Sequence, residues 1–280
     1  MASDTKKIVS LPGNFLPGLG VASTASLGQR LDGSRNEIWL CPAYAANAQG
    51  LMLFVKPSLS RRAMFVEMLA AQLGQCLKLP CPSPYLTTVD PVHVGRPRGA
   101  KPIVAFGSES VSERALSRTV KNLDALMQIL ERLKLSESVA SFDEWIGNSV
   151  RSPTDIIFDP EGRAYLIDHE CAMADALKPD EQIGNWVALQ LIQRVKPAER
   201  PALLRALRAR VAAAHRARLE PVPAAVQYAQ DGIAIYTSLI DFLQQRLQHL
   251  DQLLSQRVLP GQMHINQAIE DHDSDRAAEL

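Results

Sequence analysis

The chain has 280 residues, 46% of them hydrophobic, and its 30 lysines and arginines balance its 30 aspartates and glutamates. This length and composition are typical of a globular protein with one large core or two lobes, and they exclude a predominantly disordered chain. The net charge of zero gives no general electrostatic reason to expect a nucleic-acid or membrane partner, so a nucleic-acid partner is left open but is not favoured.

The N-terminal part of the chain is predicted to be rich in strands. Short apolar runs bounded by Gly, Pro and polar residues predict strands over 37–42, 50–55, 85–89 and 102–107. The second run is followed at once by Lys56 and Pro57, and the chain must turn there because proline cannot extend a central strand. Ser60 is then suited to cap a helix over 60–79, which Pro80 ends.

The C-terminal part is predicted to be helical. Apolar residues recur at helical spacing over 122–135, 138–147, 182–195, 197–219 and 222–258. Residues 261–280 are polar, acidic and poor in aromatic side chains, and they predict a flexible tail. We therefore expect an α+β protein with a β-rich N-terminal lobe over 1–115 and a helical C-terminal lobe over 116–260. This is the order of lobes in a two-lobed protein-kinase-like fold.

Two charged residues stand where phosphoryl-transfer chemistry would need them. That chemistry requires a cation to neutralise phosphates, an acid to hold that cation in place, and anionic ligands for magnesium. Lys56 ends an apolar strand, so its ammonium is expected to point out of the sheet toward a cleft. Glu67 follows in the predicted helix beside the small residues Ala71 and Gly74, and a helix with a small face can approach a sheet closely. Taken alone, two unrelated surface charges would explain the pattern more often.

Two aspartates frame a predicted hairpin. Asp168 closes the apolar run AYLID, Asp155 precedes the apolar run IIF, and the turn DPEG lies between them. Because a hairpin returns the chain, we expect both carboxylates to meet at one end of it. Oxygen ligands at a strand end suit Mg²⁺, so the pair predicts a magnesium site. A strand-terminal cap or an ion pair would explain either aspartate alone equally well.

Several motifs together resemble the HipA-type serine/threonine kinases and their lipid-kinase-like relatives. That family shows a pattern close to FDxWIxNxDRHxxN, then a hairpin, then LIDH. This chain has FDEWIGNSVRSPTD over 142–155 and LIDH over 166–169. Segments that resemble the family's lysine strand, glutamate helix, helix exit and hinge are 54–57, 65–70, 79–82 and 105–108. The resemblance covers about residues 50–175, with the parts in the family's order and spacing.

The resemblance implies a role for each matched position. Lys56 would contact the nucleotide phosphates and pair with Glu67, and Asp168 would bind Mg²⁺. The residues whose backbone groups would face adenine are Ala105, Phe106, Gly107 and Ser108. The family's phosphate-contacting loop would correspond to the Gly- and Ser-rich segment 18–33, although such a segment is more often a plain surface loop. Its candidate residues are Ser23 and Ser26.

Three positions depart from the family pattern within six residues. Val150 stands where the family has its catalytic aspartate, Ser152 where it has the following histidine, and Asp155 where it has a metal-binding asparagine. Asp155 can still bind a cation. Valine cannot accept a proton, and the loss of general-base catalysis costs on the order of 10²–10⁴ in rate.

The resemblance and its departures together favour a HipA-like pseudokinase. Such a protein would bind ATP and Mg²⁺ and act through a protein partner, in a bacterial regulatory, toxin–antitoxin or defence context. One alternative is an active kinase or nucleotidyl transferase that uses Asp155 or Asp143 as its base. The other is a nucleotide-free scaffold whose interaction surface is the basic stretch 197–219, although a solvated helix face explains such a stretch more often. The oligomeric state is left open.

The sequence also predicts a location in the cell. None of the four cysteines forms a CxxC pair, which fits a reducing cytosol. No run of 18 apolar residues predicts a transmembrane span, and the first 15 residues lack the apolar core of a signal peptide. We therefore expect a cytoplasmic protein without a membrane partner.

Overall fold

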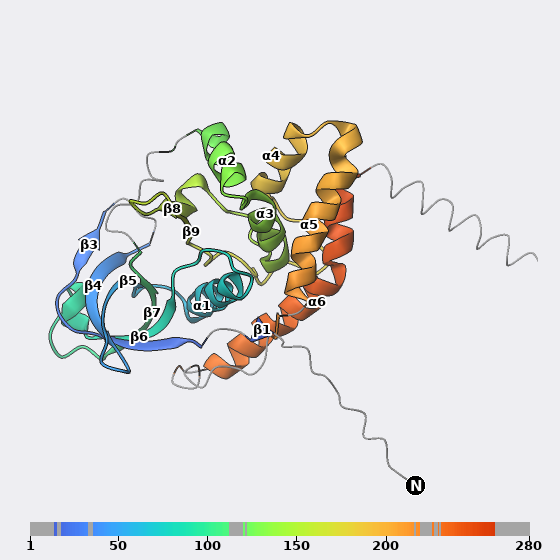
Figure 1. Ribbon diagram of the computed structural model, residues 1–280. Coiled ribbons are helices and arrows are strands. Elements are labelled where there is room, and N and C mark those ends of the chain that lie inside the picture. Colours follow the sequence, from blue (N-terminus) through green and yellow to red (C-terminus); the bar gives the residue numbers. More distant parts are fainter. Residues whose placement is uncertain are drawn as a thin grey trace, which may run out of the picture.

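Strands dominate the N-terminal half of the chain and helices the C-terminal half, as the sequence predicts for an α+β protein (Figure 1). The computed structural model describes residues 14–15, 18–32, 36–111, 120, 122–215, 217–218, 226, 229 and 231–260. The predicted boundary at residue 115 and the predicted tail over 261–280 lie outside these residues.

Six strands form the N-terminal sheet, in the order β2-β6-β7-β5-β4-β3. They are β2 (Gly20–Thr24), β3 (Gln29–Leu31), β4 (Ile38–Ala45), β5 (Gly50–Lys56), β6 (Pro84–Val89) and β7 (Ile103–Glu109). Strand β2 also pairs with β4, so β2, β6, β7, β5 and β4 form a closed ring. Neighbouring strands are antiparallel except β2 and β6, which are parallel. Closing the ring pairs the edges of these strands and gives a rigid support for residues at strand ends.

Apolar side chains fill the inside of this ring. Along β5, the buried residues Leu51, Leu53 and Val55 alternate with more exposed ones and pack with Cys41 and other residues of β4. A period of two places these side chains on one face of the sheet. Lys56 is the next residue after Val55, so its side chain leaves on the opposite face.

Helix α1 (Arg61–Cys76) lies between the sheet and the C-terminal helices (Figure 1). Ser60 caps it as predicted, since its side chain accepts a hydrogen bond from the amide of Ala63 at 3.2 Å. The helix contacts β6 and β7 on one side and α6 (Gly232–Val258) on another. Most of its residues are therefore buried, and a glutamate on such a helix requires a partner for its charge.

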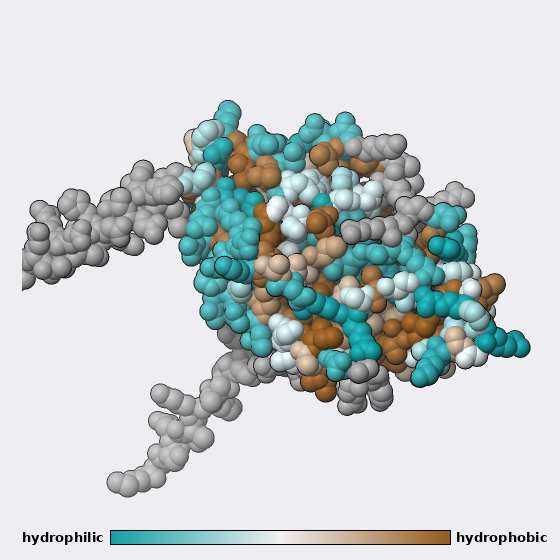
Figure 2. All heavy atoms as spheres, turned by 180° about the vertical axis from the view of Figure 1, so that it is seen from behind, coloured by the Kyte–Doolittle hydropathy of each residue, from teal (hydrophilic) through white to brown (hydrophobic). Residues whose placement is uncertain are grey.

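The C-terminal half is built around α3 (Ser136–Ile146), which packs most closely against three other helices. Those helices are α4 (Trp186–Arg194), α5 (Arg200–Ala214) and α6, and α2 (Leu123–Arg132) also contacts α3. The indole of Trp145 on α3 is buried and donates to the carbonyl of Leu243 on α6 at 3.1 Å. In the part of the chain that is described, no helix is long and apolar enough to cross a membrane. Apolar and hydrophilic side chains are interspersed on the face seen from behind (Figure 2).

A short hairpin connects α3 to the segment that returns to α1. The turn η3 (Pro153–Asp155) leads into β8 (Ile156–Phe158), which pairs antiparallel with β9 (Ala164–Leu166). Beyond β9, residues 167–170 run beside α1, where the amide of His169 donates to Glu67. The hairpin thus returns the chain to the N-terminal half.

Three predicted elements need correction. The predicted loop over 18–33 contains strands β2 and β3, because local composition does not show that distant strands pair with it. The predicted helix over 197–219 is divided into η4 (Pro197–Glu199), α5 and a short strand β10 (Ala217–Arg218), which pairs with β1 (Asn14–Phe15). The long helix predicted over 222–258 begins as α6 at Gly232.

Candidate nucleotide and metal site

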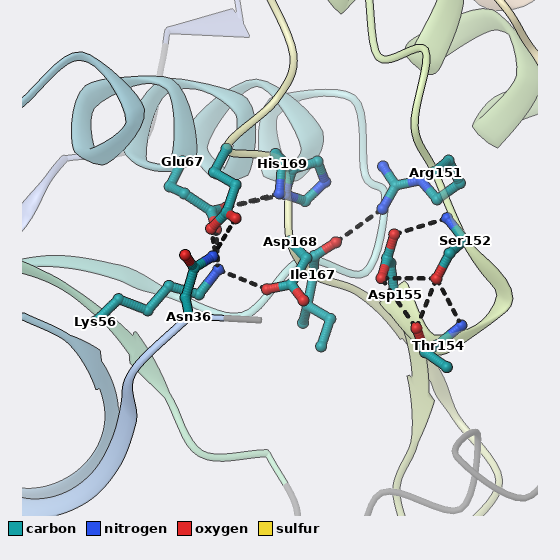
Figure 3. Close-up of polar contacts among 11 residues, drawn as sticks. Asn36, Lys56, Glu67, Arg151, Ser152, Thr154, Asp155, Ile167, Asp168 and His169 are labelled. Carbon is teal, nitrogen blue, oxygen red and sulfur yellow. Dashed lines mark hydrogen bonds and ion pairs between the residues drawn. The ribbon is translucent and has the colours of Figure 1, made fainter. Parts of the chain in front are cut away.

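The ammonium of Lys56 lies among three carboxylates at the end of β5. Its Nζ is 2.5 Å from Glu67 Oε1, 2.6 Å from Asp168 Oδ1 and 2.8 Å from Glu170 Oε2 (Figure 3). The sequence predicted that Lys56 and Glu67 pair, and the structure brings them together. The carboxylates around Lys56 come from α1 and from the segment after β9, so the site joins the two halves of the chain.

Glu67 links α1 both to the sheet and to the segment after β9. One carboxylate oxygen pairs with Lys56, and the other accepts the backbone amide of His169 at 2.9 Å. Burial alone would raise the pKa of Glu67, but the Lys56 ammonium and the hydrogen bond from His169 lower it well below the ordinary value of 4.5. The carboxylate is therefore ionised and fixed in place at neutral pH.

Lys56 is charged although its side chain is only 6% exposed. Burial alone would lower the pKa of Lys56, but the carboxylates of Glu67, Asp168 and Glu170 raise it above its ordinary range. A buried ammonium with this many acidic partners is suited to bind anionic oxygen atoms, since phosphate oxygens and carboxylate oxygens are equivalent partners for it.

Glu170 and Asn36 belong to the site, although neither was predicted from the sequence. Glu170 uses one oxygen to bind Lys56 and the other to accept the side-chain amide of Asn36, which precedes β4. The one sequence signal for Glu170 was its position two residues after Asp168. Asn36 had no comparable signal because it is 134 residues away from Glu170 in the chain.

The three acidic residues could also hold a metal ion. One oxygen from each of Glu67, Asp168 and Glu170 lies within 4.8 Å of the others. Carboxylate oxygens are the donors that Mg²⁺ prefers, so the chemistry of the set fits this ion. Asp168 and Glu170 are more exposed than Glu67, at 39% and 16% against 2%, so they are the two residues that an ion can reach more easily.

Asp155 is not a member of this acidic group. The hairpin does bring it beside Asp168, because its carbonyl accepts the amide of Ile167 at 2.9 Å. Its carboxylate, however, accepts the amide of Ser152 at 2.7 Å and the hydroxyl of Ser152 at 3.0 Å (Figure 3). Asp155 therefore caps the turn η3, and its predicted role as a metal ligand stays a prediction. Burial raises the pKa of Asp155, and the nearby Asp168 adds to this shift while Arg151 opposes it.

Arg151 fixes the loop that carries position 150. It donates to both carboxylate oxygens of Asp143, at 2.8 and 3.1 Å, and to the carbonyl of Ile167 at 2.8 Å. Asp143 is 1% exposed and fully engaged in this bidentate pair. The Asp143 carboxylate is directed to Arg151, which does not favour the alternative in which Asp143 acts as a base. Val150 is 53% exposed, so the position of the missing aspartate faces solvent.

The predicted adenine-binding segment is part of the sheet. Phe106 lies between Leu86 and Lys56, and Gly107 lies between Tyr85 and Val55. Strands thus flank this segment on both sides, so its backbone groups are used in the sheet. Ala105 likewise pairs with Thr87 and its side chain is buried inside the ring. This register does not favour the prediction that Ala105, Phe106 and Gly107 present backbone groups to a nucleotide, which stays a prediction.

Ser23 lies on strand β2 and Ser26 just after it. Ser23 is opposite Tyr44 on β4 and opposite Thr88 on β6. Ala25, the residue before Ser26, donates its amide to the carbonyl of Pro42 on β4. The prediction that these serines contact phosphate stays a prediction.

The Lys56–Glu67 pair predicts a pH dependence of stability. The pKa of Glu67 is lower in the folded protein than in the unfolded chain, so the pair stabilises the fold above pH 4.5 and loses this contribution as the pH falls toward about 2. We expect the difference in the free energy of unfolding between the wild type and Glu67→Gln to be smaller at pH 3 than at pH 6. Urea denaturation at both pH values measures it, and an equal difference at both would contradict the assignment.

Comparison with known proteins identifies a family and a fold. A family model described as HipA-like kinase matches residues 26–252. Among solved structures, the crystal structure of the proinflammatory kinase CtkA from Helicobacter pylori is similar with a TM-score of 0.51 and 13% sequence identity. The similarity covers 88% of this chain and 99% of that chain. At this identity the likeness establishes the fold alone. No curated protein matches the chain.

Proposed function

The chain belongs to the HipA-like kinase family, and from this premise we propose that it is a pseudokinase that binds ATP together with Mg²⁺. Binding would take place between a β-rich N-terminal lobe and a helical C-terminal lobe. The protein would hold the nucleotide as a ligand. Transfer of its γ-phosphoryl group to an acceptor would be slow.

The buried ion pair of Lys56 and Glu67, with Asp168 on the same ammonium, is the observation that carries the binding part. A lysine that is 6% exposed is costly to bury unless it is paired. Phosphoryl-transfer proteins need such a cation beside acidic metal ligands to receive the phosphates of a nucleotide. The Lys56 ammonium is the group suited to phosphate oxygens, and Glu67 would keep it in place.

Mg²⁺ is the cofactor that the acidic residues fit. Asp168 and Glu170 would hold it, and when bound it would offset the negative charge of the phosphates. The other contributions come from the chain itself. Lys56 binds and orients the phosphates, Glu67 holds Lys56, and the Arg151–Asp143 pair keeps the neighbouring loop in place.

The pseudokinase part depends on Val150. The loop around it is well anchored by Arg151, and the side chain at position 150 is exposed. A valine in this place cannot take a proton from an acceptor hydroxyl, and a general base contributes about 10²–10⁴ in rate. The protein would thus retain the groups for binding and lack a group for turnover.

Calorimetric titration with Mg-ATP tests the binding. We expect Lys56→Met to weaken binding by about 10- to 100-fold, because charge-assisted hydrogen bonds to phosphate are lost. Lys101→Met is a matched control, since Lys101 is an exposed lysine in a loop, and it should bind like the wild type. Asp168→Asn is a second variant at a side chain that is 39% exposed. No binding by the wild type, or unchanged binding by both site variants, would refute the proposal.

A second candidate function is an active transferase with Asp155 as its base. The raised pKa of Asp155, caused mainly by burial, favours it, because a base works best when its pKa is near the working pH. Parallel incubations with γ-labelled and α-labelled ATP separate the two candidates, because a kinase transfers the γ-phosphoryl group and a nucleotidyl transferase transfers the nucleotide that carries the α-phosphate. Incorporation by the wild type that is lost in Asp155→Asn would favour the transferase, and no incorporation would favour the pseudokinase.

The proposed output is recognition of the nucleotide-bound form by a protein partner. The context would be a bacterial regulatory, toxin–antitoxin or defence system in the cytoplasm. A partner that is captured only with Mg-ATP, and is not captured by Lys56→Met, would support this output. Capture that is independent of nucleotide would instead favour a scaffold role.

A further inference from the structure

All N–H donors of Lys56 are used within the site. An ammonium group has three such donors, and Lys56 Nζ has three carboxylate partners at 2.5, 2.6 and 2.8 Å. The side chain is 6% exposed, so little of it is accessible to water. A phosphate oxygen can therefore form a direct hydrogen bond to Lys56 only after one of the three carboxylates has left.

The three carboxylates differ in how firmly they are held. Glu67 is 2% exposed, and its second oxygen is fixed by the amide of His169. Asp168 is 39% exposed, and it is the residue expected to bind Mg²⁺. Glu170 is 16% exposed, and Asn36 holds its second oxygen from the side of β4. Glu170 is thus an additional acid on Lys56, supported by a residue from a distant part of the chain.

The charge of the group also opposes a nucleotide. One ammonium against three carboxylates leaves an excess of negative formal charge. The triphosphate of ATP is itself strongly negative, and like charges repel strongly where water is largely excluded. A divalent cation that neutralises Asp168 and Glu170 removes this repulsion and releases the donors of Lys56 together.

We propose that Glu170, held by Asn36, is a latch on Lys56 that makes nucleotide binding depend on a divalent cation. This inference rests on the proposed function, because it concerns the regulation of the same site. Without the cation, Glu170 occupies Lys56 and keeps ATP out. With the cation, Glu170 leaves Lys56 and a phosphate oxygen takes its place.

Titration with ATP in EDTA, compared with titration with Mg-ATP, tests the latch. In EDTA, Glu170→Ala should bind ATP about tenfold or more tightly than the wild type, because one donor of Lys56 is free and one negative charge is gone. Glu161→Ala is the matched control, since it removes the same charge from a side chain that is 64% exposed on the hairpin turn. Asn36→Ala, which keeps the charge and loosens the latch, should shift binding in the same direction by less.

The outcomes separate this inference from the proposed function. If the wild type binds Mg-ATP and both Glu170→Ala and Asn36→Ala bind ATP in EDTA as weakly as the wild type, the latch is wrong and the proposed function stands. An equal gain in Glu161→Ala would also overturn the latch, because the effect would be one of net charge. If the wild type does not bind Mg-ATP, the proposed function and the latch both fail. If Glu170→Ala does not fold, the result for Asn36→Ala decides.

Discussion

Replacing Val150 with aspartate is expected to raise the rate of ATP turnover by about 10²–10⁴-fold. Val150 is 53% exposed, so the new carboxylate would not be buried. The side chain of Asn148 accepts the amide of Val150 at 3.4 Å, and Arg151 is fixed by its bidentate pair with Asp143. The loop is therefore already supported, and the substitution adds a proton acceptor with one negative charge.

Val150→Asn is the control for this substitution. Asparagine has the size and polarity of aspartate, but it cannot act as a general base, so its rate should equal that of the wild type. The measurements are ADP formation and incorporation of the γ-phosphate under saturating Mg-ATP. A rate for Val150→Asp no higher than for Val150→Asn would mean that the missing base does not limit turnover. A wild type already as fast as Val150→Asp would make the protein an active enzyme.

Local sequence patterns predicted those parts of the site that depend on neighbouring residues. The apolar run before Lys56 and the turn at Pro57 predicted where β5 ends, and Ser60 predicted where α1 begins. Both follow from short-range rules for strands and helix caps. Glu67 then faces Lys56 because the first turns of α1 follow closely after the end of β5.

The pairing of distant strands could not be predicted in the same way. Alternating apolar residues show that a segment is a strand, but they do not identify its neighbour. The closure of the ring depends on β2 pairing with both β4 and β6. This pairing places Ser23 between β4 and β6, and the position of β7 between β5 and β6 makes Gly107 part of the sheet.

The role of Asp155 had a sequence signal that competed with the metal-site prediction. Ser152 and Asp155 have the S-x-x-D spacing of a capping box, and the structure forms both of its hydrogen bonds. A carboxylate that caps its own turn has fewer lone pairs for an ion. The link between Glu170 and Asn36 had no comparable signal, because it depends on how the two halves of the chain meet.

A second buried charge cluster joins Glu144 of α3 to Arg246 and Arg257 of α6. Arg246 of α6 is 0% exposed and donates from Nε to the carbonyl of Glu144 at 2.6 Å. Its Nη1 also donates to the carbonyls of Lys178, Pro179 and Glu181, at 3.3, 3.2 and 2.8 Å. The Glu144 carboxylate is shared with Arg257, whose Nε lies 3.0 Å away. Arg246 thus joins α3, α6 and the segment before α4.

Arg246→Met is expected to lower the free energy of unfolding by about 3–5 kcal/mol. Methionine keeps much of the aliphatic volume of arginine, but it has no N–H donor. The Glu144 carboxylate therefore loses one of its charged partners. The buried carbonyls that accept from Arg246 lose their hydrogen-bond donor. Arg208→Met is the matched control, because Arg208 pairs with Asp251 on the surface, where the two side chains are 43% and 61% exposed. Such a pair contributes about 0.2–1 kcal/mol.

Urea denaturation measures the free energy of unfolding of both variants. Calorimetric titration with Mg-ATP then shows whether Arg246→Met also changes nucleotide binding. Lys56 is held by groups on α1 and after β9, whereas Arg246 holds residues 178–181 against α3. Folded Arg246→Met should therefore bind Mg-ATP with nearly the affinity of the wild type. A loss of unfolding free energy no larger than that of Arg208→Met would mean that the cluster does not stabilise the fold. A large loss of affinity in the folded variant would mean that the segment before α4 is coupled to the nucleotide site.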